Sequence, residues 1–442
     1  MRVRIPAAFI LISLILTSLS GCNKSSAPEA SYTEKPHLYD YEQTPEHLGI
    51  DTENIPEPEL TYKPLNYTPQ YGMWFTVNDY PEILMTKTKE EFTAEIEHRF
   101  DNAAALGVNT VYVHVRAFGD AYYESELFSQ GLYLPAGMTF DPLEIMVECA
   151  HERKLSIHAW INPLRCQSDV QMQAMDNRFT LKEWYDDEGK NGTYLSLVDN
   201  RWWLCPAYPE VRKLIAAGAA EVVQLYEVDG IHIDDYFYPT SDASFDDEAF
   251  AESGMDSLTD FRMEQCSLMV QDIYNAVKSE NPDVLFGISP QGTLTGNASQ
   301  YADVERWCSE EGFCDYIVPQ IYFGLKNETA PFADMTALWQ GMVTNENIQL
   351  ILGIAMYKMG QEDIFAGSGK EEWLTDYTVI SKETELALSL GLGAAFYSYD
   401  AAFESDKPEM QDELDRIRGL LTKRGSLSDV GVFTIPSVTP QA

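Results

Sequence analysis

Short apolar runs alternate with amphipathic stretches along most of the chain, from about Tyr67 to Lys423. The apolar runs are rich in β-branched and aromatic residues, which indicates buried strands. The stretches between them repeat apolar residues at helical spacing, which indicates helices packed on a sheet. The expected strands are Gly72–Val77, Thr110–Arg116, Ser156–Asn162, Gly230–Tyr236, Leu285–Gln291, Tyr316–Tyr322, Leu350–Tyr357 and Gly393–Tyr399.

A helix is expected after each strand. Asp141 is a typical N-cap before Pro142, and Gly107 is a typical helix end. The expected helices are Lys89–Leu106, Pro142–Lys154, Pro209–Tyr226, Leu258–Glu280, Ala302–Glu311, Phe332–Val343, Glu371–Leu390 and Glu404–Leu421. This alternation predicts an α/β fold, a single (β/α)8 TIM-type barrel with long loops on its C-terminal face. A doubly wound open sheet is the alternative, but no Gly-rich phosphate loop follows the first strand.

The N-terminus has the pattern of an export signal. Arg2 and Arg4 precede an apolar run, Ile5–Leu16, that is too short to span a membrane. The following Leu19-Ser20-Gly21-Cys22 resembles the bacterial lipobox, in which the signal is cut before the cysteine and that cysteine is acylated. We therefore expect a signal peptide at residues 1–21 and a protein that is exported and anchored through Cys22 to the cell membrane or the outer membrane.

Residues 22–66 are rich in Pro, Glu, Ser and Thr, a composition that predicts a flexible tether. The barrel is expected at residues 67–424. The remaining residues, 425–442, are rich in Ser, Val, Thr and Pro and are either a tail or a short strand packed on the barrel.

The chain is strongly acidic, with 30 basic and 70 acidic residues and a formal net charge of -40. Such a charge argues against nucleic-acid binding. It also disfavours anionic polymers, unless Arg116 and Arg165 neutralise their acidic groups locally. Six cysteines besides Cys22 are scattered without zinc-ligand spacing, and we expect no metal or other cofactor. Cys308 and Cys314 are either a disulfide or, as for the other cysteines, buried thiols.

Strand periodicity predicts which side chains face the barrel interior. In the fourth strand, Ile231, Ile233 and Asp235 share one face, while His232, Asp234 and Tyr236 share the other. The apolar face suits packing against helices, so the polar face is expected to line the interior and its C-terminal mouth. The residues expected at the mouth or in substrate binding are Arg116, Trp160, Asn162, Arg165, His232, Asp234, Tyr236, Gln291, Gln320, Tyr322, Tyr357 and Tyr399.

Two connections at the predicted mouth are rich in aromatic residues. The first follows the second strand and reads Phe118-Gly119-Asp120-Ala121-Tyr122-Tyr123-Glu124. The second, residues 163–208 after the third strand, contains Trp184, Tyr185, Tyr194, Trp202 and Trp203 and exceeds the usual βα loop length several-fold. Aromatic side chains suit stacking on sugar rings, whose C–H faces are apolar, although a plain hydrophobic lid is the alternative.

Several blocks, in order, resemble the glycosyl-hydrolase-like family 10 lipoproteins. They include Tyr112-Val113-His114-Val115-Arg116, His158-Ala159-Trp160-Ile161-Asn162-Pro163, Asp229-Gly230-Ile231-His232-Ile233-Asp234-Asp235-Tyr236, Gly287-Ile288-Ser289-Pro290 and Pro319-Gln320-Ile321-Tyr322. The resemblance covers about residues 71–421. It implies a glycosidase-type barrel and, for some members, cleavage of peptidoglycan glycan strands that lack stem peptides.

Glycoside hydrolysis normally uses two carboxyl groups, one protonated and one ionised. Asp234 is the first choice for the ionised group, assisted by His232 or Arg116. Asp235 either turns back into the mouth where the strand ends or orients the loop by hydrogen bonding. The expected acid is Asp120, with Glu124, Glu126 and Asp400 behind it; Asp235 as acid with Asp234 as base is the alternative.

The sequence thus predicts a surface-anchored glycoside hydrolase acting on a glycan substrate, foremost peptidoglycan strands. Because the fifth and sixth strands end without a carboxylate, a non-catalytic glycan-binding lipoprotein on the same barrel is the alternative. A metal-dependent hydrolase is the third hypothesis, although no His-Glu-x-x-His pattern supports it. The sequence predicts no oligomeric state.

Overall fold

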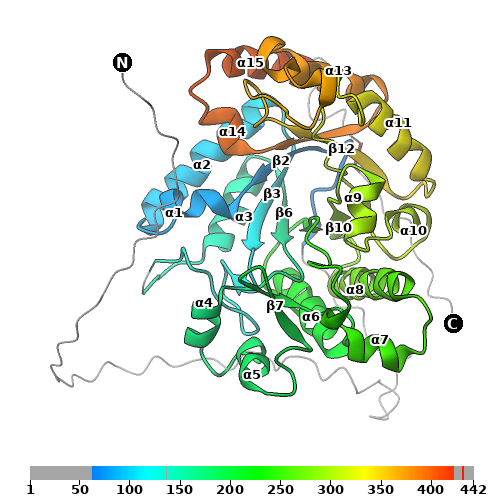
Figure 1. Cartoon of the computed structure of the whole chain (residues 1–442). Coiled ribbons are helices and arrows are strands. Elements are labelled where there is room, and N and C mark those ends of the chain that lie inside the picture. Colours follow the sequence, from blue (N-terminus) through cyan, green and yellow to red (C-terminus); the bar gives the residue numbers. More distant parts are fainter. Residues whose placement is uncertain (1–61, 136, 423–430, 433–442) are drawn as a thin grey trace, which may run out of the picture. The chain divides into compact units, whose positions relative to one another are not determined.

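The computed structural model describes residues 62–135, 137–422 and 431–432. Eight parallel strands close into a barrel, with helices around it (Figure 1). This confirms the predicted (β/α)8 barrel. In order around the barrel the strands are β10 (Leu285–Ile288), β11 (Tyr316–Ile317), β12 (Gln349–Ala355), β13 (Gly393–Tyr397), β2 (Tyr71–Phe75), β3 (Thr110–Arg116), β6 (Ser156–Ile161) and β9 (Gly230–Ile233).

The expected helices are present with small shifts at their ends. They are α2 (Lys89–Leu106), α3 (Pro142–Glu152), α6 (Pro209–Leu225), α8 (Leu258–Glu280), α10 (Val304–Ser309), α11 (Phe332–Met342), α13 (Val379–Ser389) and α15 (Pro408–Thr422). The helix expected at Glu371–Leu390 is two helices, α12 (Glu372–Thr375) and α13, because the Asp376 side chain accepts a hydrogen bond from the Thr378 backbone N–H and ends the first. In the described part of the chain, no helix is long and apolar enough to cross a membrane.

Local sequence signals fix the helix ends. Thr88 and Glu91 form a reciprocal capping box at the start of α2, and Gly107 ends that helix with a φ of 101°. Asp141 accepts hydrogen bonds from the backbone N–H groups of Leu143 and Glu144, as its predicted N-cap role requires. These caps fix the residues at which α2 begins and ends and at which α3 begins.

The buried side chains form two layers. One layer lies between strands and helices. The other fills the barrel interior and consists of Trp74, Tyr112, Trp160, Leu285, Tyr316, Val318, Ile351 and Ala395. Room for these large rings comes from glycine on neighbouring strands: a Cβ at Gly287 would lie 1.9 Å from the Tyr316 ring. The interior is therefore a packed core rather than a channel.

The N-terminal edge of the barrel is closed by residues that precede the first barrel strand. The buried carboxylate of Asp229 accepts hydrogen bonds from the Tyr62 hydroxyl (2.5 Å), the Leu65 N–H (2.5 Å) and the Ile157 N–H (2.7 Å). Residues 62–66 are thus part of the folded domain, so its boundary, expected at Tyr67, lies earlier. Within the expected tail, residues 431–432 form β14 (Gly431–Val432), which pairs antiparallel with β1 (Tyr67–Thr68). The acylated Cys22 and the rest of the expected tether lie outside the described residues.

Cys308 and Cys314 are free, as are the four other cysteines of the described chain, and all six are buried. The alternative of buried thiols is therefore the correct one. Burial is the main cause that raises the pKa of these thiols, for example to about 11 in Cys149 and to about 12 in Cys166 and Cys308.

Two long segments follow β3 and β6 on the side toward which these strands point (Figure 1). The first contains β4 (Asp120–Ala121) and β5 (Ser129–Gln130), which pair with each other. The second, residues 163–208, contains α4 (Asp169–Ala174), α5 (Thr180–Asp186) and an antiparallel hairpin of β7 (Leu195–Val198) and β8 (Arg201–Leu204). We call residues 163–208 the β6 insertion.

Candidate active site

The two adjacent carboxylates, Asp234 and Asp235, come directly after β9, which ends at Ile233. Because strand alternation stops there, Asp235 is free to turn back toward the barrel. Its Oδ1 accepts a hydrogen bond of 2.8 Å from Gln320 Nε2, and its Oδ2 accepts one from Gln291 Nε2. Both glutamines follow their strands at the C-terminal end of the barrel. The structure thus selects the first of the two alternatives for Asp235, a side chain turned into the mouth.

The two carboxyl groups lie in different environments. Asp234 is only 4% exposed, and burial followed by the charge of Asp235 raises its pKa well above 3.8. Burial also raises the pKa of Asp235, but the amide N–H donors of Gln320 and Gln291 oppose that rise. Asp234 therefore holds its proton more tightly than Asp235, the reverse of the first assignment from the sequence.

Arg165 faces this pair from the β6 insertion. Its guanidinium lies 4.2 Å above the Tyr236 ring and 4.9 Å above the Phe118 ring. Its charge lowers the pKa of both Asp234 and Asp235. The expected substrate-binding residues Arg165 and Tyr236 are therefore placed beside the carboxylates.

Aromatic side chains form much of the remaining mouth. Tyr322 lies 5.6 Å from Tyr397 and 6.0 Å from Tyr357 between ring centroids, and Tyr357 is 39% exposed. Trp160 stacks on His114 with centroids 3.8 Å apart, and its side chain is among the groups that lower the pKa of Asp234. The mouth thus combines aromatic ring faces with two carboxyl groups.

His232 was expected beside Asp234, but it lies inside the barrel with no exposed surface. The Trp74 indole N–H donates a 3.1 Å hydrogen bond to His232 Nε2, and the Tyr316 hydroxyl lies 3.0 Å from His232 Nδ1. Since Trp donates only, Nε2 accepts and Nδ1 carries the proton. Burial lowers the His232 pKa well below 6.5. His232 is therefore a neutral core residue, and neither binds substrate nor keeps Asp234 ionised.

Arg116 was also expected at the mouth, and it points the other way. The register of β3 against β6 shifts between His114 and Arg116, and this irregularity reverses the expected alternation. The guanidinium lies 4.2 Å above the Phe128 ring, and a Cβ at Gly218 of α6 would lie 2.0 Å from its Nη1. Arg116 thus packs under the loops against α6.

Asp120, the first candidate for the acid, is fully buried. Its Oδ1 accepts hydrogen bonds from the backbone N–H groups of Ala117 (3.1 Å) and Phe118 (2.9 Å), which holds the turn after β3. Burial is the main cause that raises its pKa to about 6. This placement gives Asp120 a structural role. It argues against direct contact with a sugar.

The other candidates divide between the mouth and the surface. Glu124 and Glu126 are exposed on the loop after β4. Asp400 accepts a hydrogen bond from the Ser398 hydroxyl and raises the pKa of Tyr397, which places it near the wall of the mouth. Asn162 is buried and donates a 3.2 Å hydrogen bond to the Ala117 carbonyl, so it braces the loop after β3.

Tyr399 was expected at the mouth and lies outside the barrel wall. Strand β13 ends at Tyr397, and Tyr399 belongs to α14 (Tyr399–Phe403). Its ring stacks on Phe75 and its hydroxyl accepts a 2.9 Å hydrogen bond from Asn102 of α2. Tyr397 takes the place in the mouth that was assigned to Tyr399.

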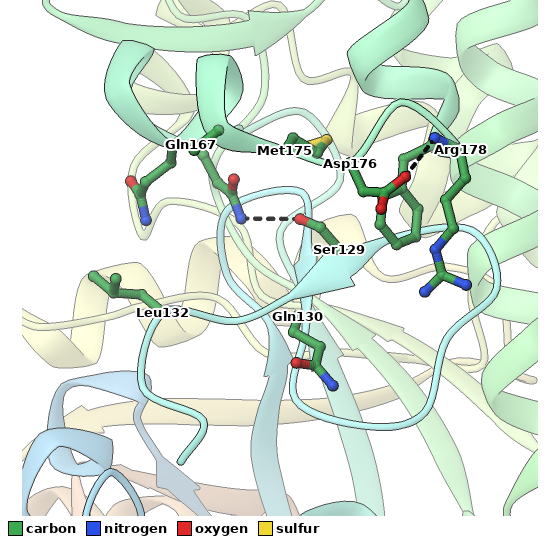
Figure 2. A pocket seen from close by; sticks show the side chains of 10 residues that line it. Ser129, Gln130, Leu132, Gln167, Met175, Asp176 and Arg178 are labelled. Carbon is green, nitrogen blue, oxygen red and sulfur yellow. Dashed lines mark hydrogen bonds between the residues drawn. The ribbon is translucent and has the colours of Figure 1, made fainter. Parts of the chain in front are cut away.

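A groove of about 630 Å³ lies between the two long segments (Figure 2). Ser129, Gln130 and Leu132 come from the segment after β3, and the rest of its lining comes from the β6 insertion. A 3.3 Å hydrogen bond from Gln167 Nε2 to Ser129 Oγ joins the two walls. The lining from the insertion is Gln167, Gln171, Ala174, Met175, Asp176, Arg178 and Phe179.

The sequence was compared with models of known protein families. Residues 70–367 match the family described as glycosyl hydrolase-like 10. The chain belongs to this family. The resemblance stated from the sequence blocks is thereby confirmed.

Two curated relatives of this glycosyl hydrolase-like 10 protein carry glycosyl hydrolase names. It is 30% identical over 336 residues to glycosyl hydrolase YngK of Bacillus subtilis, a match that covers 70% of this chain and 64% of YngK. It is 29% identical over 338 residues to glycosyl hydrolase DigH of Escherichia coli K12, covering 66% of this chain and 74% of DigH. The chain thus spans less than two thirds of YngK.

Solved glycosidase structures share the barrel fold. α-L-Fucosidase isoenzyme 2 from Paenibacillus thiaminolyticus superposes with a TM-score of 0.52 at 15% identity, over 80% of this chain and 49% of the fucosidase. The glycoside hydrolase domain of PgaB from Bordetella bronchiseptica gives 0.50 at 11% identity, over 79% and 99%. At these identities the likeness concerns the fold alone.

One mouth residue of this family member escaped the sequence reasoning: Tyr397. It lies on a predicted strand, and its ring centroid is 5.9 Å from that of Trp74 in the barrel interior. Applying the two-residue alternation to the whole eighth strand would have found it.

Proposed function

We propose that this protein hydrolyses glycosidic bonds of a polysaccharide through acid and base catalysis by Asp234 and Asp235. The observation that carries the proposal is the pair of neighbouring carboxyl groups in unlike surroundings, with Asp234 buried and Asp235 held by two amide donors. Unlike environments that separate the protonation states of two carboxyl groups are how glycosidases assign acid and base. The family and the barrel fold support the same reaction class.

In this mechanism, Asp234 donates its proton to the glycosidic oxygen as the bond from the anomeric carbon to that oxygen breaks. Asp235 stabilises the positive charge that develops on the sugar and accepts the proton of the attacking water. Gln291 and Gln320 keep Asp235 ionised and oriented. Arg165, beside the pair, limits the rise in both pKa values.

The proposed substrate is the glycan strand of peptidoglycan, which the family resemblance suggested. Tyr322, Tyr357 and Tyr397 offer ring faces on one side of the mouth, and Trp203, 6.2 Å from Tyr236, adds a fourth. We further propose that the protein acts at the cell surface, anchored through an acylated Cys22. Loss of fatty-acid labelling in Cys22→Ser tests the anchor.

Release of reducing ends from peptide-stripped peptidoglycan strands tests the reaction. Asp234→Asn and Asp235→Asn should each lower kcat by roughly 10²- to 10⁴-fold. The matched control Asp415→Asn, on the exposed face of α15, should retain the wild-type rate. If both mouth variants retained it as well, hydrolysis through this pair would be excluded.

One observation favours a second candidate, a glycan-binding protein without turnover. Both carboxylates come from one strand, and β10 and β11 are followed by Gln291 and Gln320 rather than by an acid. Binding of the same strands by the wild-type protein without release of reducing ends would support this candidate. Insensitivity of any measured release to chelators would dispose of the metal-dependent alternative.

A further inference from the structure

Arginines without an ion-pair partner are concentrated in the β6 insertion. Within residues 62–135 and 137–422, four arginines make no ion pair with another described residue within 4.0 Å, whereas the other seven do. Three of the four, Arg165, Arg178 and Arg201, belong to the β6 insertion; Arg116 is the fourth. In a chain with 70 acidic and 30 basic residues, unpaired arginines are unexpected by composition alone.

Arg165 and Arg201 both lie against one aromatic ring, that of Phe118. Their guanidinium carbons are 4.9 Å and 4.2 Å from the centroid of Phe118. Burial and then the charge of Arg165 lower the pKa of Arg201, so the two positive charges are near each other. Nε of Arg165 is buried and has no protein hydrogen-bond partner. Two like charges held together, with a donor unused, form a site that an anion would stabilise.

The third arginine continues this site into the groove. Arg178 lines the groove of about 630 Å³ together with the glutamines at 130, 167 and 171 (Figure 2). Gln167 is two residues beyond Arg165, so the groove begins within about 8 Å of the mouth along the backbone. Amide groups suit sugar hydroxyls, and Leu132, which is 56% exposed, offers an apolar surface for a sugar ring.

We propose that Arg165, Arg201 and Arg178 bind the carboxylates of an anionic glycan whose chain runs from the mouth into this groove. A guanidinium pairs with a carboxylate through two parallel hydrogen bonds, which neutral sugars cannot reproduce. Arg165 and Arg201 lie together against Phe118 and Arg178 lies in the groove, so the site offers two separate positions for a carboxylate. The inference rests on the proposed hydrolase function and adds the charge of its substrate.

The test compares kcat/KM on peptide-stripped peptidoglycan strands, which carry a lactyl carboxylate on every second sugar, with kcat/KM on their methyl esters. Polygalacturonate, with a carboxylate on every sugar, is the third substrate. Wild type should prefer the free acid over the ester, and Arg201→Gln should lower that ratio roughly tenfold. Arg178→Gln should lower it on long strands only. Preference for polygalacturonate would assign the arginines to a uronate polymer instead.

Arg306→Gln is the matched control, since Arg306 is paired with Glu264 and Glu310 on the outer side of the barrel. It should leave the ratio unchanged. Equal rates of wild type on free acid and ester, or an unchanged ratio in Arg201→Gln, would overturn the inference. Titration of the Asp234→Asn protein with both strand forms separates this failure from that of the proposed function: tighter binding of the free acid without any wild-type turnover would support the arginine site alone.

Discussion

Gln320 donates a 2.8 Å hydrogen bond from its side-chain amide to Asp235, so that a residue after β11 holds a carboxylate at the end of β9. The same amide nitrogen lies 3.1 Å from the Ser289 carbonyl after β10. Groups that follow three neighbouring strands, β9, β10 and β11, thereby hold the Asp235 carboxylate in place. A substitution of Gln320 can therefore change the pKa of Asp235 without altering the carboxylate itself.

Replacement of Gln320 by alanine should move the acid limb of the pH profile. If Asp235 works ionised, activity is lost as the pH falls below its pKa. The Gln320 N–H lowers that pKa, so Gln320→Ala should raise it and shift the acid limb of kcat/KM to higher pH by about one unit. Gln349→Ala, which removes an amide hydrogen-bonded to the Tyr67 carbonyl at the opposite end of the barrel, is the control. A shift in both variants would contradict the assignment.

Replacement of Trp160 by phenylalanine should move the alkaline limb. If Asp234 works protonated, activity is lost as the pH rises above its pKa. The Trp160 side chain is among the groups that lower that pKa, so Trp160→Phe, which removes the indole N–H, should shift the alkaline limb to higher pH, again by about one unit. Trp307→Phe, which removes an indole N–H bonded to Ser267 in the helical layer, should leave it in place. If Trp160→Phe moved the acid limb of the pH profile instead, Asp234 would be the group that works ionised.

Asp120 should make stability depend on pH. Its pKa is raised from 3.8 to about 6 in the folded protein, so the folded state binds the proton more tightly than the unfolded state. The stabilising effect is complete below about pH 4 and is lost as the pH rises through 6, at a cost of about 3 kcal/mol. Asp120→Asn keeps an oxygen for the Ala117 and Phe118 N–H groups but cannot ionise. Its free energy of unfolding in urea should therefore rise relative to wild type between pH 4 and pH 7.

The same variant tests catalysis. Because Asp120 is buried in a turn, Asp120→Asn should retain kcat within a few-fold of wild type at pH 5. A loss of a hundredfold or more, with the folded protein intact by circular dichroism, would return Asp120 to the role of acid.

Gly218 should be intolerant of a side chain. A Cβ there would lie 2.0 Å from Arg116 Nη1 and 2.4 Å from the Phe128 ring. Gly218→Ala should therefore lower the free energy of unfolding by about 1–3 kcal/mol through overpacking. Gly419→Ala, in α15 with no atom within 4 Å of its Cβ position, should raise it by about 0.5–1 kcal/mol. Equal effects measured by urea unfolding would contradict the placement of Arg116 against α6.

The sequence by itself determined the barrel and much of its mouth. Eight apolar runs separated by capped helices leave a parallel barrel as the simplest way to bury every strand on both faces. Alternation within regular strands correctly placed Trp160 inside the barrel and the isoleucines of β9 against the helices. Caps such as Asp141 and Gly107 were predicted because their chemistry acts over a few neighbouring residues.

Only the tertiary structure decided the residues where regular strand geometry ends. Alternation stops after Ile233, so Asp235 joins Asp234 in the mouth. In β3, the register shift between His114 and Arg116 reverses the alternation and turns the Arg116 side chain toward α6. Tyr397 replaces Tyr399 because β13 ends there. These outcomes depend on contacts between strands that are distant in the chain, such as Gln320 with Asp235, and a periodic pattern within one strand carries no information about them.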